Sequence, residues 1–344
     1  MSFERFLRPG VATAQPYAVT DMAGGALRLK DNESPLTLSA AQQQALLAPL
    51  AGLEFNRYPD SLRQLREKLA ARHDWPLDGI VLGNGSDELI LLLMLTFGRG
   101  PVVVHRPTFV MYEQTARVLD RPVTVLDLEP ETWELPAATT DAAATAALVF
   151  LASPNSPTGN VYARDRIEAV LRHAAGIVVL DEAYADYAGI TYRDLLGRYP
   201  HAAILRTFSK VGLAGLRLGY LLAQPTVIKY LLRVKLPYNV NAAVAAMGCA
   251  YLDTVSISDL VAPVVAARAT LARGLQALGW TVYPSQANLL FCRVAGARAI
   301  AARLRAQNIW VRDFDGAFAD CLRITVGTTA DNARLLAALP GGTG

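Results

Sequence analysis

The chain has 344 residues, of which 52% are hydrophobic and 18% are charged, and its net charge at pH 7 is +3. This length suits two lobes better than one core, and the composition excludes bulk disorder. Arginines and lysines are spread along the chain without runs of like charge, which argues against nucleic-acid or membrane-surface binding. No segment offers the roughly 18 unbroken apolar residues of a membrane span, and MSFERFLRPG lacks the apolar core of a signal peptide.

Three cysteines and four histidines are scattered along the chain without the spacing of a metal site. An odd number of cysteines suits a reducing compartment, where the thiols act as small buried apolar groups. We therefore expect a soluble, cytoplasmic protein that holds no metal.

Short, continuous apolar runs recur in the first two thirds of the chain. Runs of four to eight residues rich in Val, Ile and Leu predict strands buried on both faces, as in a mainly parallel sheet. Helical patterns lie between them, for example over 86–97 and 163–174. This alternation predicts an α/β fold. The predicted strands are 80–83, 101–105, 147–152, 176–181, 202–207 and 216–223.

The pattern changes after about residue 240, which predicts a second, smaller α+β lobe. We expect the first forty residues to form an arm that packs partly with this lobe. The predicted division is an arm and part of the small domain over 1–40, a large domain over 41–245 and a small domain over 246–344. The expected small-lobe elements are a helical stretch over 241–278, strands at 288–294, 309–312 and 321–327, a helix near 297–307 and a closing helix.

Lys210 is one of only five lysines, and it lies in RTFSKVGLAGLRLGY between a predicted buried strand and a glycine-rich segment. Ligands bind at the carboxyl ends of strands in parallel α/β sheets. A lysine shielded from water at such a place can form a Schiff base with an aldehyde. The alternative is a lysine exposed in a surface loop, which describes most lysines.

Asp181 ends the apolar run in GIVVLDEAYADY. A carboxylate there is costly to bury unless it meets a cation or hydrogen-bond donors. Pyridoxal phosphate needs a protonated ring nitrogen, which an aspartate can maintain. Tyr184 follows three residues later and could reach the phenolic oxygen of that ring. The alternative is a solvated Asp-Glu pair at a strand end.

The segment VLGNGSDELILLL predicts a strand, a tight turn and a helix that opens at Ser86 and Asp87. The first N–H groups of a helix form a natural phosphate site. Gly83-x-Gly85 lacks the third glycine of the dinucleotide fingerprint, and GxxxxGK[ST] does not occur. An ordinary helix N-terminus remains the alternative.

SPNSPTG (153–159) follows a predicted strand and must be a loop, because its prolines prevent regular strand pairing. Asn155 and Ser156 are the polar groups that this loop could aim at a ligand. Phe109, in PTFVMY, offers a flat face for stacking an aromatic ring, although such a residue is more often part of a core.

The order of these features along the chain resembles that of the fold type I pyridoxal-phosphate enzymes and, among them, the histidinol-phosphate aminotransferases. The resemblance implies a large domain with a mainly parallel sheet, a small α+β domain, pyridoxal 5'-phosphate as cofactor and a homodimer. It also implies amino transfer between histidinol phosphate and 2-oxoglutarate. It extends over nearly the whole chain, through QPY (15–17), DNESP (31–35), RYPD (57–60), SDE (86–88), SPNSPTG, DEAYADY, RTFSK, GLRLGY, PYNVN (237–241), VRD (311–313) and LRITVGT (322–328).

The same resemblance implies a role for each candidate residue. Lys210 binds the cofactor and moves the proton between substrate and cofactor, and Asp181 keeps the ring nitrogen protonated. Tyr184 hydrogen-bonds the phenolic oxygen and Phe109 stacks on the ring. The implied phosphate ligands are Ser86, Asp87, Ser209, Arg217 and, across the dimer, Tyr58.

Three further residues are implied to contact the substrate: Tyr17 from the partner subunit, Arg312 and Arg323. Arg323 has a physical rationale, because one guanidinium fork fits either a carboxylate or a phosphate. Its apolar neighbours in LRITVGT predict a largely buried strand, so the cation needs an anionic partner.

Two departures from the family pattern affect these expectations. Ser156 stands where the family usually has asparagine before PTG, so the neighbouring Asn155 is expected to take over the bond to the cofactor. The gap from Lys210 to Arg217 is one residue shorter than in SKAFGLAGLR, the commonest family form. We expect a locally shortened loop from which Arg217 still reaches the phosphate.

Other functions remain open at this stage. A threonine-phosphate decarboxylase or an aromatic amino-acid aminotransferase has the same cofactor site. The QPY and LRITVGT motifs favour a histidinol-phosphate aminotransferase over both. Domains of this type also occur in cofactor-sensing regulators that carry a basic DNA-binding module. The first forty residues are too few and too weakly basic for such a module.

Overall fold

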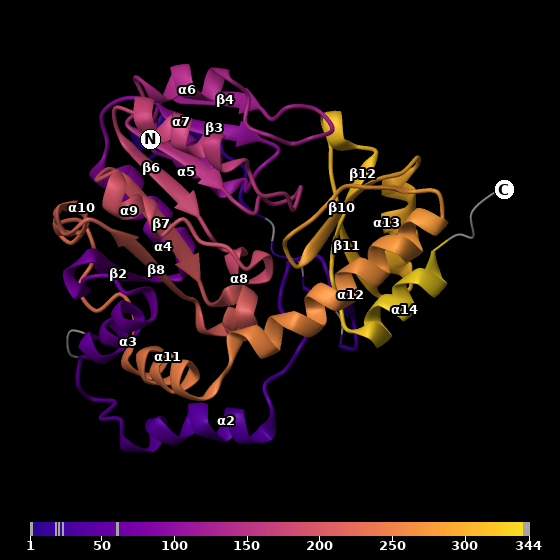
Figure 1. The fold of residues 1–344 in the computed structure, drawn as a ribbon, viewed down its shortest axis with the longest axis horizontal. Coiled ribbons are helices and arrows are strands. Elements are labelled where there is room, and N and C mark those ends of the chain that lie inside the picture. The colour runs from indigo at the N-terminus through magenta and orange to yellow at the C-terminus, as the bar shows by residue number, and fades with distance from the viewer. Residues whose placement is uncertain (1–2, 18, 20, 23, 60–61, 340–344) are drawn as a thin grey trace.

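The computed structural model describes residues 3–17, 19, 21–22, 24–59 and 62–339 and contains two β-sheets (Figure 1). The larger sheet has seven strands and the smaller has five. Helix α12 (Ile257–Ala277) contacts two strands of the smaller sheet and the short segments at residues 185–188 and 209–213, which follow strands of the larger sheet, and so connects the two parts. This architecture confirms the predicted fold class. Residues 1–2 and 340–344, the ends of the predicted arm and small domain, lie outside the described residues, and the division near 40 and 245 stays a prediction.

The larger sheet has the strand order β2-β8-β7-β6-β5-β3-β4, in which β8 alone runs antiparallel to its neighbours. All six strands predicted for it are present, with ends that move by at most two residues. Its strands are β2 (Ile80–Asn84), β3 (Val102–Arg106), β4 (Val123–Asp127), β5 (Leu148–Ala152), β6 (Ile177–Asp181), β7 (Ala202–Thr207) and β8 (Leu218–Ala223).

Strand β4 was not predicted from the sequence. Its residues, VTVLD, are only partly buried and lie at the edge of the sheet, where one neighbour, β3, supplies all the pairing. An edge strand lacks the continuous apolar run that marks a strand buried on both faces.

Helices cover both faces of the larger sheet, as the continuous apolar strands require. Val102 and Val104 of β3 pack on one face with α4, α5 and α10, whereas Val103 packs on the other face with α6, α7 and α9. This alternation follows from the two-residue period of a strand. The helices that flank the sheet are α4 (Gly85–Thr96), α5 (Met111–Val118), α6 (Ala138–Ala143), α7 (Arg164–His173), α9 (Leu195–Arg198) and α10 (Pro225–Leu231).

The smaller sheet has the order β1-β11-β12-β10-β9. Strand β1 (Leu27–Leu29) comes from the N-terminal forty residues and pairs in parallel with β11, at the other end of the sequence. This pairing brings the predicted arm into the smaller lobe. The remaining elements are β9 (Thr281–Val282), β10 (Leu289–Arg293), α13 (Ala297–Ala306), β11 (Ile309–Asp313), β12 (Cys321–Thr325) and α14 (Thr329–Ala338).

The helical stretch expected over 241–278 is two helices, α11 (Ala242–Thr254) and α12. The break lies at Val255 and Ser256, whose extended backbone ends one helix and caps the next: Ser256 Oγ accepts a hydrogen bond from Asp259 N at 3.4 Å. In the part of the chain that the structure describes, no single helix has the length and apolarity to cross a membrane, although α11 and α12 taken together, bent by 77°, meet that test.

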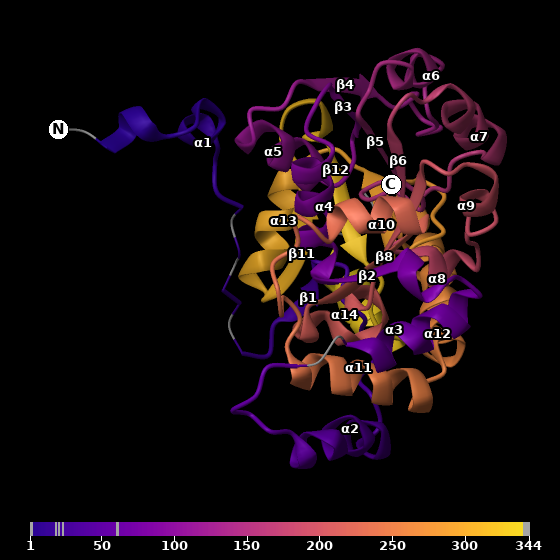
Figure 2. The same ribbon diagram turned by 90° about the vertical axis from the view of Figure 1, so that its left-hand side faces the viewer.

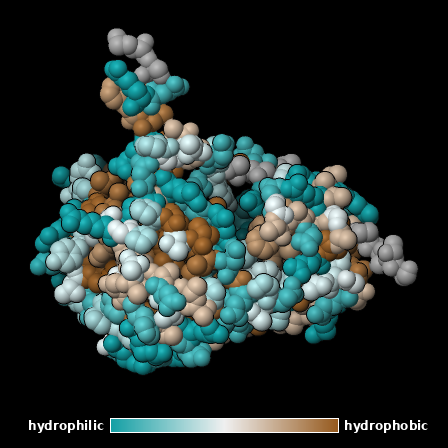
Figure 3. Space-filling view, turned by 90° about the horizontal axis from the view of Figure 1, so that it is seen from above, coloured by the Kyte–Doolittle hydropathy of each residue, from teal (hydrophilic) through white to brown (hydrophobic). Residues whose placement is uncertain are grey.

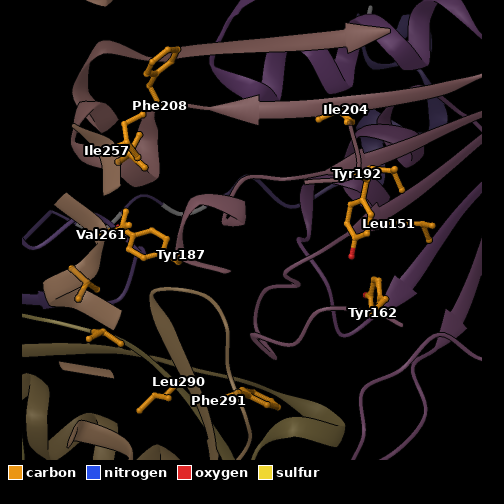
Figure 4. Packing of buried hydrophobic residues seen from close by; sticks show 14 of the residues in the cluster. Leu151, Tyr162, Tyr187, Tyr192, Ile204, Phe208, Ile257, Val261, Leu290 and Phe291 are labelled. Atoms are coloured by element: carbon orange, nitrogen blue, oxygen red, sulfur yellow. The ribbon is translucent and has the colours of Figure 1, made fainter. Parts of the chain in front are cut away.

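One hydrophobic cluster continues from the larger sheet to the smaller one, so the two sheets share a core. Figure 4 follows part of it from Ile204 and Leu151 through Phe208, Ile257 and Val261 to Leu290 and Phe291.

The other helices are α1 (Pro9–Thr13), α2 (Ala40–Leu47), α3 (Arg63–His73) and α8 (Ala185–Ala188), with short turns η1 (Phe3–Phe6), η2 (Ala48–Gly52), η3 (Leu77–Gly79), η4 (Ser209–Leu213), η5 (Ala214–Leu216) and η6 (Gly316–Phe318).

The N-terminal segment stands away from the body of the molecule (Figures 2 and 3). It is attached through α5 and the turn that follows: Gly10 N donates to Asp120 Oδ1 at 2.7 Å, and Gln114 Nε2 donates to Gln15 O at 3.1 Å. Phe3 and Phe6 at its tip are each more than 75% exposed.

His73, at the end of α3, is a partly buried histidine whose Nε2 lies 2.8 Å from Tyr220 Oη. Burial, together with Arg206, Arg72 and Arg193, lowers its pKa to about 3. The folded protein therefore keeps His73 neutral, whereas the unfolded chain takes up a proton near pH 6.5. Its contribution to stability is complete above about pH 6.5 and is lost as the pH falls toward 3.

We expect His73→Gln to flatten the dependence of stability on pH. Between about pH 6.5 and 5, the wild-type protein should lose about 1–2 kcal/mol more unfolding free energy than the variant. Urea unfolding at a series of pH values measures this, with His173→Gln, at an exposed position, as the control. Identical slopes for wild type and His73→Gln would contradict it.

Candidate active site

Three loops meet at the carboxyl ends of β5, β6 and β7. SPNSPTG follows β5, Asp181 is the last residue of β6, and Ser209 begins the turn after β7. An inner cavity of about 90 Å³ lies there, and an outer cavity of about 340 Å³ extends from it toward the smaller sheet. Four residues line both cavities: Phe109, Ser156, Tyr184 and Lys210.

Lys210 lies on the turn η4, which two buried hydroxyls hold in place. Tyr187 Oη donates to Lys210 O at 2.6 Å, and Tyr251 Oη donates to Val211 O at 2.5 Å. The amine itself reaches into the site: Nζ donates to Asp31 O at 3.1 Å and lies 5.8 Å from the centre of the Tyr184 ring. A nucleophile on a fixed backbone beside an aromatic ring is well placed for covalent chemistry.

Asp181 is 5% exposed, and each of its carboxylate oxygens accepts one hydrogen bond. Tyr112 Oη donates to Oδ2 at 2.5 Å, and Ala183 N donates to Oδ1 at 2.9 Å. Burial raises the pKa of Asp181 to about 6, although these two donors and Lys210 oppose the shift. The site therefore contains a carboxylate of raised basicity at its inner end, suited to bind a protonated ring nitrogen.

Tyr184 directly precedes α8 and is connected to the smaller sheet through Asn32. Asn32 Nδ2 donates to Tyr184 Oη at 2.9 Å, and Asn32 itself exchanges hydrogen bonds with Thr325 of β12. Asn32 lies in the DNESP motif, but its contact with Tyr184 was not predicted from the sequence. Its position indicates that it orients the Tyr184 hydroxyl toward the cavity.

The start of α4 faces Arg217 across the inner cavity. Arg217 Nη2 donates to Asp87 Oδ2 at 2.9 Å, and Nη1 lies 3.4 Å from Ser209 Oγ. Gly85 has φ +78, and a Cβ built on it would lie 2.7 Å from Arg217 Nη2, so only glycine leaves this space open. Arg217 therefore lies beside the start of α4, and its contact with a phosphate stays a prediction.

The polar groups of the inner cavity are complementary to those of pyridoxal phosphate. Helix N–H groups at Ser86 and Asp87, a hydroxyl and a guanidinium provide donors for a phosphate at one end of the cavity. At the other end Asp181 provides the carboxylate for the ring nitrogen, and Phe109 lines the wall between them. The cavity therefore has donors and an acceptor where a phosphorylated pyridine ring requires them.

Asn155 does not lie where the sequence analysis expected it. Its side chain is fully buried inside the loop: Nδ2 donates to Pro107 O at 2.9 Å and to Thr158 Oγ1 at 2.7 Å, and Oδ1 accepts from Thr108 at 2.6 Å. These bonds point it away from both cavities, and Ser156 lines them instead. The predicted contact between Asn155 and the cofactor is therefore corrected: Asn155 shapes the loop.

Arg323, on β12, lies at the floor of the outer cavity. Nη1 donates to Ser156 Oγ at 3.0 Å and Nη2 donates to the carbonyl of Lys30, while Nε is buried with no hydrogen-bond partner in the described chain. Burial lowers its pKa. A buried guanidinium with only neutral acceptors and an unsatisfied N–H is prepared to bind an anion.

The outer cavity is strongly basic. Arg312 on β11 lies opposite Arg323 on the neighbouring strand β12. Tyr17 from the N-terminal segment lines the same cavity. Asp31 is the single carboxylate among the lining residues of the described chain. Two of the cavity's cations were not predicted from the sequence: Arg28 in β1 and Lys30, which directly follows that strand. The cations that line it are Arg28, Lys30, Lys210, Arg312 and Arg323.

Tyr58 lies outside both cavities of this chain. It is 77% exposed, and its ring stacks on Tyr238 with 4.4 Å between centroids. Among the described residues, no hydrogen bond joins its hydroxyl to Arg217 or Ser209. This position is compatible with the prediction that Tyr58 serves the site of a second subunit.

A mainly parallel sheet with a lysine, an aspartate and a phosphate-type helix start at its strand ends defines a pyridoxal-phosphate-dependent transferase of fold type I. The chain matches the family model for aminotransferase class I and II over residues 18–339 and belongs to that family. The match confirms the predicted enzyme class and cofactor.

Two curated relatives and one solved structure are similar along nearly their whole length. The chain is 38% identical to histidinol-phosphate aminotransferase 2 of Nitrosococcus oceani (98% of this chain, 97% of that protein). It is 37% identical to histidinol-phosphate aminotransferase of Chromobacterium violaceum (98% of each). The fold is shared with histidinol-phosphate aminotransferase of Sinorhizobium meliloti in complex with pyridoxal-5'-phosphate (TM-score 0.84, 22% identity, 98% and 97% covered).

Proposed function

We propose that this protein is a histidinol-phosphate aminotransferase, which interconverts histidinol phosphate plus 2-oxoglutarate and imidazole-acetol phosphate plus glutamate. The observation that carries the proposal is the full-length match, at 37–38% identity, to curated enzymes of that name. The basic outer cavity supports it, because both amino donors carry an anionic group away from the amine. A site with several fixed guanidinium groups suits a phosphate and a carboxylate alike.

The proposal assigns a role to each of the chain's own groups in the site. Lys210, on its fixed turn, takes and returns the proton at the substrate's α-carbon. With pyridoxal phosphate bound, Asp181 would keep a proton on the ring nitrogen, Tyr184 would donate to the phenolic oxygen, and Phe109 would cover a face of the ring. When bound, pyridoxal phosphate supplies the electron sink that makes that α-carbon proton acidic. The backbone N–H groups of Ser86 and Asp87, the Ser209 hydroxyl and the Arg217 guanidinium would hold its phosphate.

At the outer end, Arg323 binds the phosphate of one substrate or a carboxylate of the other, and Arg312 adds a second cation. Because Arg323 already has two neutral acceptors and a buried guanidinium, it loses little side-chain freedom when the anion binds. The cations also attract anionic substrates to the cavity.

We also propose a cytoplasmic homodimer in which Tyr58 and Tyr17 serve the partner's site. Exposed apolar side chains on the N-terminal segment and near Tyr58 support this assembly, for example Phe3, Phe6 and Phe55. Cys249, Cys292 and Cys321 are buried free thiols, which suits a reducing compartment. Sedimentation equilibrium should give twice the chain mass of 37.0 kDa, and a monomer at micromolar concentration would contradict the assembly.

Steady-state assays with three amino donors test the substrate. With 2-oxoglutarate as acceptor, kcat/KM for histidinol phosphate should exceed that for phenylalanine by about tenfold or more, because only the former fills the basic cavity with a phosphate. Phosphothreonine should release no carbon dioxide. A preference for phenylalanine, or decarboxylation of phosphothreonine, would keep the family and replace the proposed substrate.

A further inference from the structure

Tyr112 is a buried residue that contacts the inner end of the site but was given no role by the sequence analysis. Its hydroxyl donates to Asp181 Oδ2 at 2.5 Å, and its side chain lines the inner cavity. We propose that Tyr112 is a positioning residue: its hydroxyl holds the Asp181 carboxylate in the orientation and charge state that keep a proton on the cofactor's ring nitrogen. The proposal rests on the function proposed above.

Aromatic packing fixes the position of the Tyr112 hydroxyl. The ring stacks on Phe150 of β5, with 4.8 Å between centroids and 15° between planes. It also meets Phe109 edge to face, at 5.5 Å and 84°. Because only two rotatable bonds connect the ring to the backbone of α5, these contacts leave the hydroxyl little freedom. Tyr112 therefore contacts both the carboxylate and the ring that lines the cofactor cavity.

The hydroxyl acts as a donor and not as an anion. Burial and the neighbouring Asp181 raise the pKa of Tyr112 well above its usual range, so it keeps its proton. Among the described residues, the only acceptor of its hydrogen bond is Asp181 Oδ2. A neutral phenol beside a carboxylate lowers the proton affinity of that carboxylate.

Four groups besides burial act on the charge of Asp181. Tyr112 from α5, the N–H of Ala183 and Lys210 from η4 favour the carboxylate, whereas Asp87 from α4 disfavours it. Tyr112 and Ala183 are its two hydrogen-bond donors. Without the Tyr112 hydroxyl, Oδ2 would lose its donor in a buried place, and the pKa of Asp181 would rise above about 6.

The consequence concerns one proton shared by two bases. In the pair formed by Asp181 and a ring nitrogen, the proton lies either on nitrogen, beside a carboxylate, or on oxygen, beside a neutral ring. No proton is gained or lost between these forms. By weakening the carboxylate as a base, the Tyr112 hydroxyl shifts the proton to nitrogen, where the ring draws electrons more strongly.

Tyr112→Phe removes only the hydroxyl and keeps both ring contacts. In the protein freed of cofactor, carbon-13 NMR of the Asp181 carboxyl group should report a pKa higher by about one unit. In the holoenzyme, the nitrogen-15 resonance of ring-labelled pyridoxal phosphate should move toward that of neutral pyridine. We expect kcat to fall about tenfold and KM to change little.

Tyr162→Phe is the matched control, because Tyr162 is equally buried and its hydroxyl has no hydrogen-bond partner among the described residues. It should leave both resonances and kcat unchanged. Incorporation of 3-fluorotyrosine at position 112 strengthens the donor and should lower the Asp181 pKa, opposite to phenylalanine. This second variant keeps the proposal testable if Tyr112→Phe fails to fold.

Two failures can be told apart by these measurements. If cofactor binds to wild type and to Tyr112→Phe, but neither the Asp181 titration nor the ring nitrogen resonance moves, the role of Tyr112 is wrong and the proposed enzyme stands. If the wild-type protein binds no pyridoxal phosphate, the proposed function is wrong, and the Asp181 titration still reports on the hydrogen bond.

Discussion

Lys210→Ala should lower kcat by about 10³-fold or more while the protein remains folded and still binds pyridoxal phosphate noncovalently. The amine is the group in the site that can both bind the cofactor aldehyde and carry the substrate proton. Its loss removes two contributions at once, and the effect should therefore exceed that of any other single substitution described for this chain. The visible absorbance of the lysine-bound cofactor should disappear with it.

The fold should tolerate this change, because Lys210 Nζ has one hydrogen bond, to the carbonyl of Asp31, and the turn is held by Tyr187 and Tyr251. Lys229→Ala, at an exposed position on α10, is the control and should keep full activity. If both variants unfold near the midpoint temperature of the wild-type protein, the loss of activity in Lys210→Ala is a loss of catalysis and not of folding. A Lys210→Ala protein that retained full transamination would remove the basis of the assignment.

Arg323→Met should lower kcat/KM by about 10²-fold or more for histidinol phosphate and for glutamate together. Each charge-assisted hydrogen bond to an anion contributes about 1.5–3 kcal/mol, and the guanidinium fork makes two. Methionine fills a similar volume without charge. Because the two substrates share this one anion site, both should be affected, whereas the content of bound cofactor should not change.

Stability gives a second readout of the same substitution. Arg323 is a buried cation with neutral acceptors and an unsatisfied Nε, an arrangement that costs free energy in the absence of an anion. The unfolding temperature of Arg323→Met without substrate should therefore not fall. Arg303→Met on α13, at an exposed position, is the control and should leave both substrates unaffected. Loss of only one substrate would contradict a shared anion site.

The buried strands could be predicted from the sequence because each is a short, largely apolar run. The same pattern singled out two candidate site residues: Asp181, the last residue of β6, and Lys210, which follows β7. Strand β4 could not be found in this way, because an edge strand exposes one side and its apolar residues are interrupted by Thr124. The break between α11 and α12 depends on two residues of extended backbone that helical periodicity does not reveal.

Residues that act across the fold were harder to predict. Asn32 reaches Tyr184 from 152 positions away, and Tyr112 reaches Asp181 from 69 positions away. No local pattern indicates such partners, although Tyr112 lies in PTFVMY, one helical turn after Phe109. Asn155 was misplaced for a related reason: the loop's own hydrogen bonds, not the motif, decide which of two neighbouring polar side chains faces the cavity.

The most direct test of the central claim is an absorbance spectrum of the purified protein before and after histidinol phosphate is added without 2-oxoglutarate. The proposal predicts a visible band from lysine-bound pyridoxal phosphate that histidinol phosphate removes and 2-oxoglutarate restores. A band that ignores histidinol phosphate would keep the cofactor and reject the substrate. The absence of any visible band, even after pyridoxal phosphate is supplied, would contradict the assignment of Lys210 and the function built on it.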